Sequence, residues 1–546
     1  MRETIRPQLQ LGESAIGAIE IDAKSGDDIP RLLRALQHIY VTPELREPVF
    51  AILAEVLPQR PDGEGPVSSE TGRPGMTQWQ MLVLGTLRLE LNADYDRVQE
   101  LANAHRTARQ MLGHSDWADE TRWSVQTLKD NLRLFTPEVL ERINAVVVAA
   151  GHALLRKSLD DGLEVRCDSF VVETDVHYPT DINPLYDAVR KVIETSAALC
   201  EGEGLSDWRQ SAYNLRCLTI MGRAEPPRTM KCRLAPDPSL TPTLSRRARE
   251  QTRCANFIVK KAHRCAQQLK RSTAKDPEQR AARQATIRAA HEDYLDLAKQ
   301  FLERAQFTRI KLEHACKLPA VLLTALDDYL AHGERQIDQV RRRVLNGETI
   351  AHHEKVFSIF EPCTEWINKG EAGVPVELGL LVAVSEYQFG FILNHRVMQK
   401  ETDEQVAEPL VADLAERYRT VISVSMDKGF HSPANQQGLA EIIDFPVLPK
   451  KGKCSPSELE REHHPRFRRL RRRHSAVESA INALGAHGLD RCADHGLEGF
   501  TRHFSLAEVA RDRPSTASVL RIPRCRSHLA WTHAEAWRNE GLDLWD

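Results

Sequence analysis

The stretch that decides the fold reads Val165-Arg-Cys-Asp-Ser-Phe-Val-Val-Glu-Thr-Asp-Val-His-Tyr-Pro-Thr-Asp181. Its first half is rich in β-branched and apolar residues, which indicates a β-strand. Two sets of residues alternate along it, Leu163, Val165 and Cys167 against Glu164, Arg166 and Asp168. The carboxylate of Asp168 is therefore predicted to point away from the apolar face. An ionised carboxylate in a strand is costly unless something binds it. A divalent metal ion would do so, and a solvated charge on an exposed strand is the alternative.

Length and composition indicate a globular protein of several domains. A chain of 546 residues with 41% hydrophobic and 28% charged residues should form two or three domains. The 11 cysteines show no C-x-x-C pair, which is typical of a reducing compartment. The first residues contain no apolar run of the secretory type, and no apolar stretch approaches the ~18 residues of a membrane span. We therefore expect a cytoplasmic protein without a membrane segment.

The first 155 residues are predicted to be all helical. Apolar residues recur at helical spacing over 28–58 and again from Thr77, on either side of a Pro/Gly-rich break. Two short amphipathic pieces, Tyr95–His105 and Arg106–Leu112, would suit a helix-turn-helix that lies on DNA, and equally a small bundle that only packs. A further helix is expected to begin at Thr136-Pro137.

A long helical and basic section is predicted over 191–349. Its positive charge is densest at Arg246, Arg247, Arg249, Arg253, Lys260, Lys261, Arg264, Lys270 and Arg271. Such a run is either a solvated helical face or an electrostatic footprint for a phosphate backbone, and the net charge of −3 for the chain does not decide between them.

The period changes to that of strands after Pro375. Paired strands are predicted over 376–384 and 389–395, followed by a helix over 403–419. The run 420–426 is almost continuously apolar, as in a strand buried on both faces, and it ends at Asp427. Ser432-Pro433 then opens another helix. Because open α/β sheets build their sites at the carboxyl ends of strands, Asp427 is a candidate site residue.

An Arg-rich helix is predicted over 466–484, with Leu470, Val477, Ile481 and Leu484 as its buried stripe. Arg471, His474, Glu478 and Asn482 form an adjacent stripe at helical spacing. Glu478 is either an ion-pair partner within this helix or a third acid at the strand ends. Acids from separate elements that converge on one point can hold two Mg²⁺ ions about 3.5–4 Å apart and act on a phosphodiester.

The chain resembles the DDE transposases of bacterial insertion sequences, most closely the ISNCY-like group. The similarity covers roughly residues 20–511. It rests on the stretch quoted above and on Gly72–Gln80, His353–Pro362, Gly373–Gly379, Asp427–Asn435, Leu448–Lys453 and Ala476–Asn482. The resemblance implies an α/β fold with an RNase H-like catalytic core, a mixed sheet flanked by helices. This core would occupy 156–190 and 350–512, be interrupted by the helical insertion 191–349, and follow an all-α, DNA-binding domain over 1–155.

By the same resemblance, Asp168, Asp427 and Glu478 are the catalytic triad and the ligands of two Mg²⁺ ions, for which Mn²⁺ would substitute. The implied partners are double-stranded DNA, as terminal inverted repeats and as target, and further copies of the chain on that DNA, in the bacterial cytoplasm and nucleoid. Arg471, His474, Lys450, Lys451 and Lys453 are the expected DNA contacts. An RNase H-like nuclease or resolvase, and an inactive DNA-binding relic, remain alternatives.

Three features compete with this interpretation or depart from it. Asp175 and Asp181 are rival acids near Asp168. Cys454, His463 and His464 are an incomplete zinc pattern. Asp512 and Pro514 interrupt the helix that the family continues there, so that 513–546 is predicted to be an atypical tail.

Overall fold

The computed structural model describes residues 3–5, 13–22, 25, 27–58, 75–114, 120–154, 162–177, 179, 182–205, 208, 259–260, 263, 277–351, 354–368 and 376–520. They form two units, one made of 1–175 and 365–546 and the other of 176–364. The predicted division is therefore changed in two places. The N-terminal helices belong to the same unit as the sheet, and the inserted unit begins before residue 191 and ends after residue 349.

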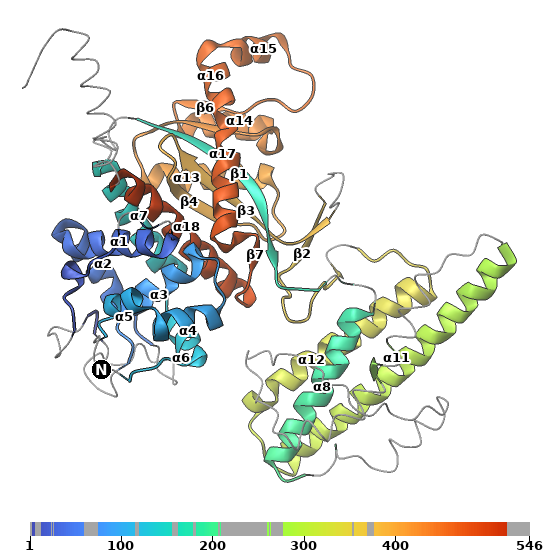
Figure 1. The fold of residues 1–546 in the computed structure, drawn as a ribbon. Helices are drawn as coiled ribbons and strands as arrows, with labels where there is room; N and C mark the ends of the chain where they lie inside the picture. Colours follow the sequence, from blue (N-terminus) through green and yellow to red (C-terminus); the bar gives the residue numbers. More distant parts are fainter. Residues whose placement is uncertain are drawn as a thin grey trace, which may run out of the picture. The chain divides into compact units, whose positions relative to one another are not determined.

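The first unit is built on a seven-stranded mixed sheet (Figure 1). Its strands are β1 (Leu163–Thr174), β2 (Glu365–Asn368), β3 (Val376–Tyr387), β4 (Ile392–Val397), β5 (Val421–Met426), β6 (Phe445–Val447) and β7 (Arg491–Cys492). The order is β2-β3-β1-β5-β6, with β4 also paired to β3 and β7 to β1. The central strand β1 runs antiparallel to β3 and parallel to β5, which in turn runs parallel to β6.

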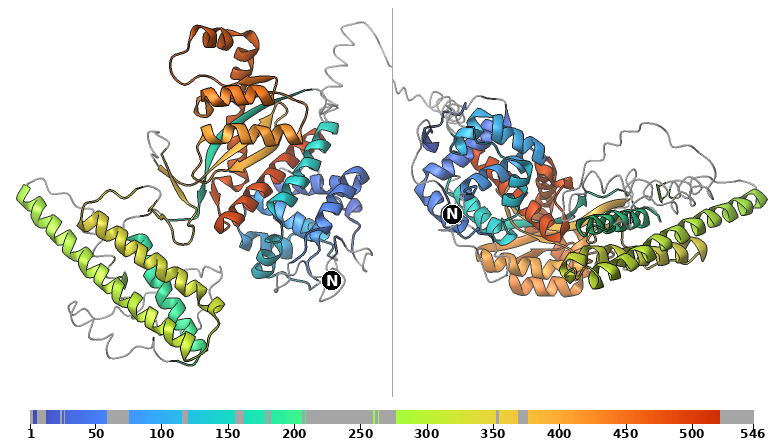
Figure 2. Two further views of the ribbon diagram at one scale, coloured as in Figure 1. Left: turned by 180° about the vertical axis from the view of Figure 1, so that it is seen from behind. Right: turned by 90° about the horizontal axis from the view of Figure 1, so that it is seen from below.

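The predicted alternation along β1 is confirmed. Leu163, Val165 and Cys167 are buried, whereas Asp168, which follows Cys167, is only half-buried. The buried side faces a core that includes residues of α13 (Asp403–Arg417) and α14 (Pro433–Ile442), which lie along one face of the sheet (Figure 2). Apolar residues on one side of a strand thus fix which side carries the carboxylate.

Helices also cover the other side of β1. Phe170 contacts Phe504 of α18 (Gly496–Leu520), and Glu164 pairs with arginines of α16 (Pro465–His474). The Arg-rich helix that the sequence predicts as one piece is two helices, α16 and α17 (Ala476–Leu484), with Ser475 between them. A third short helix, α15 (Pro456–His463), precedes them.

The N-terminal helices are α1 (Asp28–Val41), α2 (Pro43–Ala54), α3 (Gln78–Glu90), α4 (Tyr95–Ala104), α5 (Arg106–Met111), α6 (Val125–Leu132) and α7 (Pro137–Leu154). The helix α3 begins with a capping box at Thr77 and is buried along nearly its whole length. Its Arg88 forms a buried ion pair with Asp494, 2.8 Å away, next to β7. This pair ties the N-terminal helices to the unit that contains the sheet.

The prediction that Asp512 and Pro514 break the last helix is wrong. The helix α18 continues through both residues to Leu520, and Asp512 is completely buried. Its carboxylate accepts hydrogen bonds from the backbone N–H of Ile392, at 3.1 Å, and from Asn144 of α7, at 3.3 Å. These bonds explain why a residue of low helix propensity is stable there. Residues 521–546, with Trp531, Trp537 and Trp545, lie outside the described residues.

In the described part of the second unit, the long helices are α8 (Asn183–Gly202), α11 (Pro277–His314) and α12 (Ala320–Val340). They pack side by side through a core that includes Val189, Leu302 and Leu326 (Figure 1). The predicted helical character is thus confirmed for the described part of the insertion. Of the nine basic residues at 246–271, only Lys260 falls among the described residues. In the part of the chain that the structure describes, no helix is both long and apolar enough to cross a lipid bilayer.

Candidate active site

Asp168, in the middle of β1, and Asp427, directly after the end of β5, lie side by side on two neighbouring parallel strands. In the β1–β5 pair Cys167 is opposite Met426, so the next residue on each strand is an aspartate. Asp427 ends β5, as predicted, and caps a short 3₁₀ turn because its Oδ1 accepts the N–H of Gly429 at 2.7 Å. Carboxylates from two strands distant in sequence therefore meet near the carboxyl end of β5, in the interior of the sheet.

Glu478 lies in the first turn of α17 and is exposed. The negative charge of Glu478 contributes to the raised pKa of Asp168, as the charge of Asp427 also does. His474, one helical turn earlier, is directed to the sheet, with its Nδ1 3.3 Å from the hydroxyl of Ser425 on β5. Burial lowers the pKa of His474.

A fourth acid, Asp403, belongs to this group and was not predicted. It opens α13, and its Oδ1 accepts a hydrogen bond of 2.6 Å from the hydroxyl of Ser169, the residue after Asp168. A Cβ atom built on Gly429 would lie 2.8 Å from Asp403 Oδ2 and 3.0 Å from Asp427 Oδ1, so both carboxylates border that glycine. In the sequence Asp403 has the ordinary pattern of a first-turn acid that favours a helix N-terminus.

The four acids form a concentration of negative charge. Burial raises the pKa of Asp168 to about 6, with additional contributions from Asp427, Asp403 and Glu478, whereas the N–H of Ser169 opposes the shift. Burial and the charge of Asp427 also raise the pKa of Asp403. A divalent cation at this position would offset part of this charge.

The donor set is all carboxylate oxygen, which is the chemistry that Mg²⁺ prefers. Across the described residues, no three side chains of the His, Cys, Asp or Glu type are gathered tightly enough to coordinate one ion. Glu478 is exposed, so rotation of its side chain is unhindered by burial. The residues present therefore fit a divalent ion in charge and chemistry, and coordination would require side-chain movement.

The five predicted DNA contacts differ in whether their side chains already pair with acidic residues. Lys450 Nζ is 2.6 Å from Glu458, and Arg471 is 3.3 Å from Glu462. Lys451 and Lys453 are exposed, and the charge of Lys451 acts on Asp403. With His474 directed to the sheet, Lys451 and Lys453 are the members of this set that are most accessible to a ligand.

The rival acids and the zinc pattern are placed as follows. Asp175 lies beyond the end of β1 and pairs with Arg491 at 2.8 Å, and Asp181 is outside the described residues. The thiol of Cys454 is 3.7 Å from Glu462 Oε1, and His464 caps α16 through its Nδ1. These contacts account for both residues without a metal ion.

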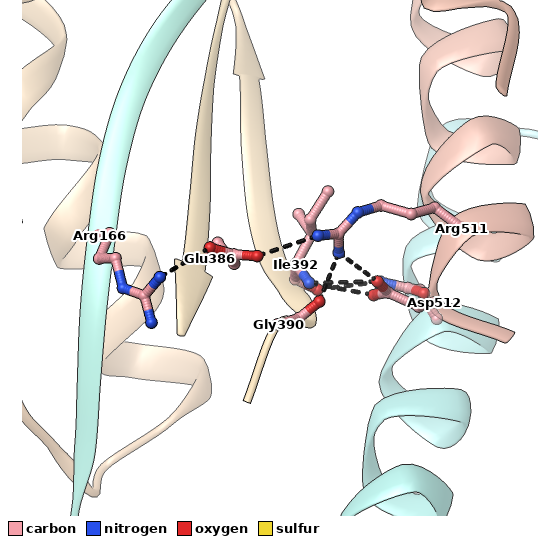
Figure 3. Close-up of polar contacts among 7 residues, drawn as sticks. Arg166, Glu386, Gly390, Ile392, Arg511 and Asp512 are labelled. Carbon is pink, nitrogen blue, oxygen red and sulfur yellow. Dashed lines mark hydrogen bonds and ion pairs between the residues drawn. The ribbon is translucent and has the colours of Figure 1, made fainter. Parts of the chain in front are cut away.

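A buried ionic network connects the candidate strand to the last helix (Figure 3). Arg166, two residues before Asp168, is 3.3 Å from Glu386 on β3. Glu386 is also 2.9 Å from Arg511, whose Nη1 donates to the carbonyl of Gly390 at 2.6 Å and to Asp512 at 2.9 Å. Arg166 is therefore connected to α18 through Glu386 on the neighbouring strand β3.

Comparison of the chain with protein-family models, with curated proteins and with solved structures gives no match.

Proposed function

We propose that this chain is a transposase that cuts and joins DNA strands by a metal-dependent DDE mechanism. The observation that supports this most is the placement of Asp168 and Asp427 on adjacent parallel strands, with the charge of Glu478 acting on the same carboxyl group. The resemblance of the surrounding motifs to insertion-sequence transposases supplies the reaction class.

The strand arrangement supports the same proposal. A central strand with antiparallel neighbours on one side and parallel neighbours on the other is compatible with an RNase H-like core. In that interpretation β1 carries the first acid, β5 the second and α17 the third. The helical unit 176–364 then separates the first acid from the second in the sequence.

The proposed roles follow from the contacts of each residue. Asp168, Asp427 and Glu478 would hold two Mg²⁺ or Mn²⁺ ions, with Asp427 oriented by the N–H of Gly429. When bound, such ions lower the pKa of an attacking water or 3′-hydroxyl and offset the charge on the leaving oxygen. The hydroxyl of Ser169 fixes Asp403 beside this group, where it adds a further negative charge. Attack on the phosphate is in line and requires no covalent intermediate on the protein.

The substrate in this proposal is double-stranded DNA, first as the terminal inverted repeats of the element and then as a target. Synapsis of two DNA ends would bring together two or more copies of the chain. The clustered basic residues of the insertion and of α16 fit a polyanionic partner better than the overall charge of −3 does.

The test is a strand-transfer assay on the flanking terminal repeats with Mg²⁺ or Mn²⁺. Joined products are expected from the full chain, and chelation with EDTA should abolish them. Asp427→Asn should reduce joining by more than about 100-fold, because even residues outside a metal ion's ligand shell typically change activity 10- to 100-fold. Asp444→Asn is the matched control, since Asp444 is exposed and precedes β6, at the opposite end of the parallel strands from Asp427.

The assay also separates the alternatives. Cleavage without joining would favour a nuclease or resolvase, and binding without cleavage would favour an inactive relic. Joining that survives Asp427→Asn would contradict the proposed role of that residue.

A further inference from the structure

A cleft of about 680 Å³ opens along the first half of β1, and no residue lining it was among the predicted DNA contacts. It lies between the first half of β1, the turn that joins β3 to β4, and the junction of α16 with α17. Its polar lining is Glu164, Arg166, Gln388, Arg472, Arg473, Ser475 and Ser479, and its apolar lining includes Phe389 and Ile422.

The lining is positively charged on balance. It contains three arginines and one acid, Glu164, which is already paired with Arg473 at 2.9 Å and with Arg469 at 2.6 Å. Arg472 is exposed, and the structure gives it no ion pair within the described part of the chain. A guanidinium without an acid partner in a concave site is suited to bind an anion.

The least exposed arginine of the cleft is Arg166, which is held by an acidic partner on β3. Arg166 has a side chain that is only 13% exposed, and its partner Glu386 is shared with Arg511. The carboxylate of Glu386 contacts both Arg166 and Arg511, and Arg511 is paired with Asp512 as well. Such an arginine loses little conformational freedom when it binds a ligand.

The cleft lies in line with the candidate active site. Glu164, Arg166 and Asp168 point to the same side of β1, so Arg166 precedes Asp168 by about 6.6 Å along the strand. A chain of phosphates that places one phosphate at the acids would place a neighbouring phosphate over the arginines. A single inorganic phosphate would leave most of the cleft unfilled, whereas a nucleotide would also reach Phe389.

We propose that this cleft binds a nucleotide of the substrate strand through its phosphate, next to the phosphate that undergoes chemistry. Arg166 and Arg472 contact the phosphate oxygens, Ser479 donates a further hydrogen bond, and Arg473 stays fixed by Glu164. This inference rests on the proposed function for the identity of the strand, and on the cleft alone for the anion site.

The test is metal-free binding of a labelled DNA duplex to the full chain, measured by fluorescence anisotropy over a series of salt concentrations. Arg472→Gln should weaken binding about tenfold at low salt and reduce the slope of log K against log salt by about 1, as expected when one phosphate contact is lost. Arg419→Gln is the matched control, because Arg419 is exposed between α13 and β5, outside α16 and the insertion, and does not line the cleft. Its effect should stay below about twofold. Thermal unfolding of both variants should match that of the unaltered chain.

Equal losses of DNA binding for Arg472→Gln and Arg419→Gln would overturn the proposal. Inorganic phosphate and a mononucleotide are tested as competitors. If Arg472→Gln weakened the binding of these competitors but not that of DNA, the proposal would also be overturned, because the cleft would then bind a free anion. If the unaltered chain joins strands and Arg472→Gln binds DNA as well as the control does, the cleft proposal is wrong and the proposed function is unaffected. If only Arg472→Gln loses DNA binding and neither the unaltered chain nor any variant cleaves DNA, the cleft proposal is supported and the proposed function is wrong.

Discussion

Replacing Arg511 by methionine tests the network that connects α18 to the candidate strand. The side chain of Arg511 is 9% exposed and donates to Glu386, to Asp512 and to the carbonyl of Gly390. Methionine retains much of the apolar stem but removes the charge. Two buried carboxylates, with side chains 5% and 0% exposed, then lose a common cation. Removing one partner of a buried ion pair typically costs about 3–5 kcal/mol, which is the loss expected near neutral pH.

The loss should depend on pH in a defined direction. Burial already raises the pKa of Glu386, and it raises that of Asp512 to about 7. Without Arg511 both pKa values rise further above those of the unfolded chain. Stability contributed by protonation of such groups is complete at low pH and is lost as the pH rises through the folded-state pKa. Arg511→Met should therefore be less destabilising at about pH 5.5 than at about pH 8, by at least 1–2 kcal/mol.

Urea unfolding followed by circular dichroism at the two pH values measures this difference. Arg468→Met is the control, and a change within about 0.5 kcal/mol is expected for that exposed residue. Addition of Asp512→Asn to Arg511→Met should restore part of the stability, since it removes one uncompensated charge. A penalty that is the same at both pH values, or no larger than that of the control, would refute the reasoning.

Two further predictions concern the sheet and the site. Gly379→Ala should destabilise the protein by about 3 kcal/mol or more, because the new Cβ would lie 2.0 Å from the carbonyl oxygen of Val172 on β1. Gly202→Ala, which meets nothing within 4 Å, should leave the melting temperature nearly unchanged, and equal melting temperatures for the two variants would contradict this geometry. Asp403→Asn should lower strand joining by about 10- to 100-fold and raise the Mg²⁺ concentration needed for half-maximal joining, as expected of a group that supports the ligands. Unchanged joining at limiting Mg²⁺ would place Asp403 outside the mechanism.

The sequence was sufficient to predict the strands that carry the first two acids. An apolar run that ends in Asp427, followed by Ser432-Pro433, has one simple explanation, a buried strand that turns into a helix. The alternation around Asp168 likewise determines which side of β1 is polar. In both places local pattern and tertiary packing agree.

Other features depend on contacts between distant parts of the chain. Asp403 looks like any acid in a first helical turn, and its place in the site follows from tertiary contacts with Ser169 and Gly429. Asp512 reads as a helix breaker, but hydrogen bonds from Ile392 and Asn144 stabilise it inside α18. The break at Ser475 has no signal in an Arg-rich run. Tertiary contacts of this kind override local propensity and cannot be predicted from spacing alone.

The order of the strands along the chain has a consequence for biosynthesis. The central strand β1 leaves the ribosome long before its neighbours β3 and β5. The helix α18, which contacts the side of β1 that carries Phe170, is made after all three strands. At typical rates of about 5–20 residues per second, roughly 20–70 s pass between translation of Asp168 and of Leu520. During that interval β1 has unpaired edges that other chains could bind. The helical unit 176–364 can fold in the meantime, since it consists of one continuous segment. A messenger cut short before β5 would therefore yield a chain without the second and third acids.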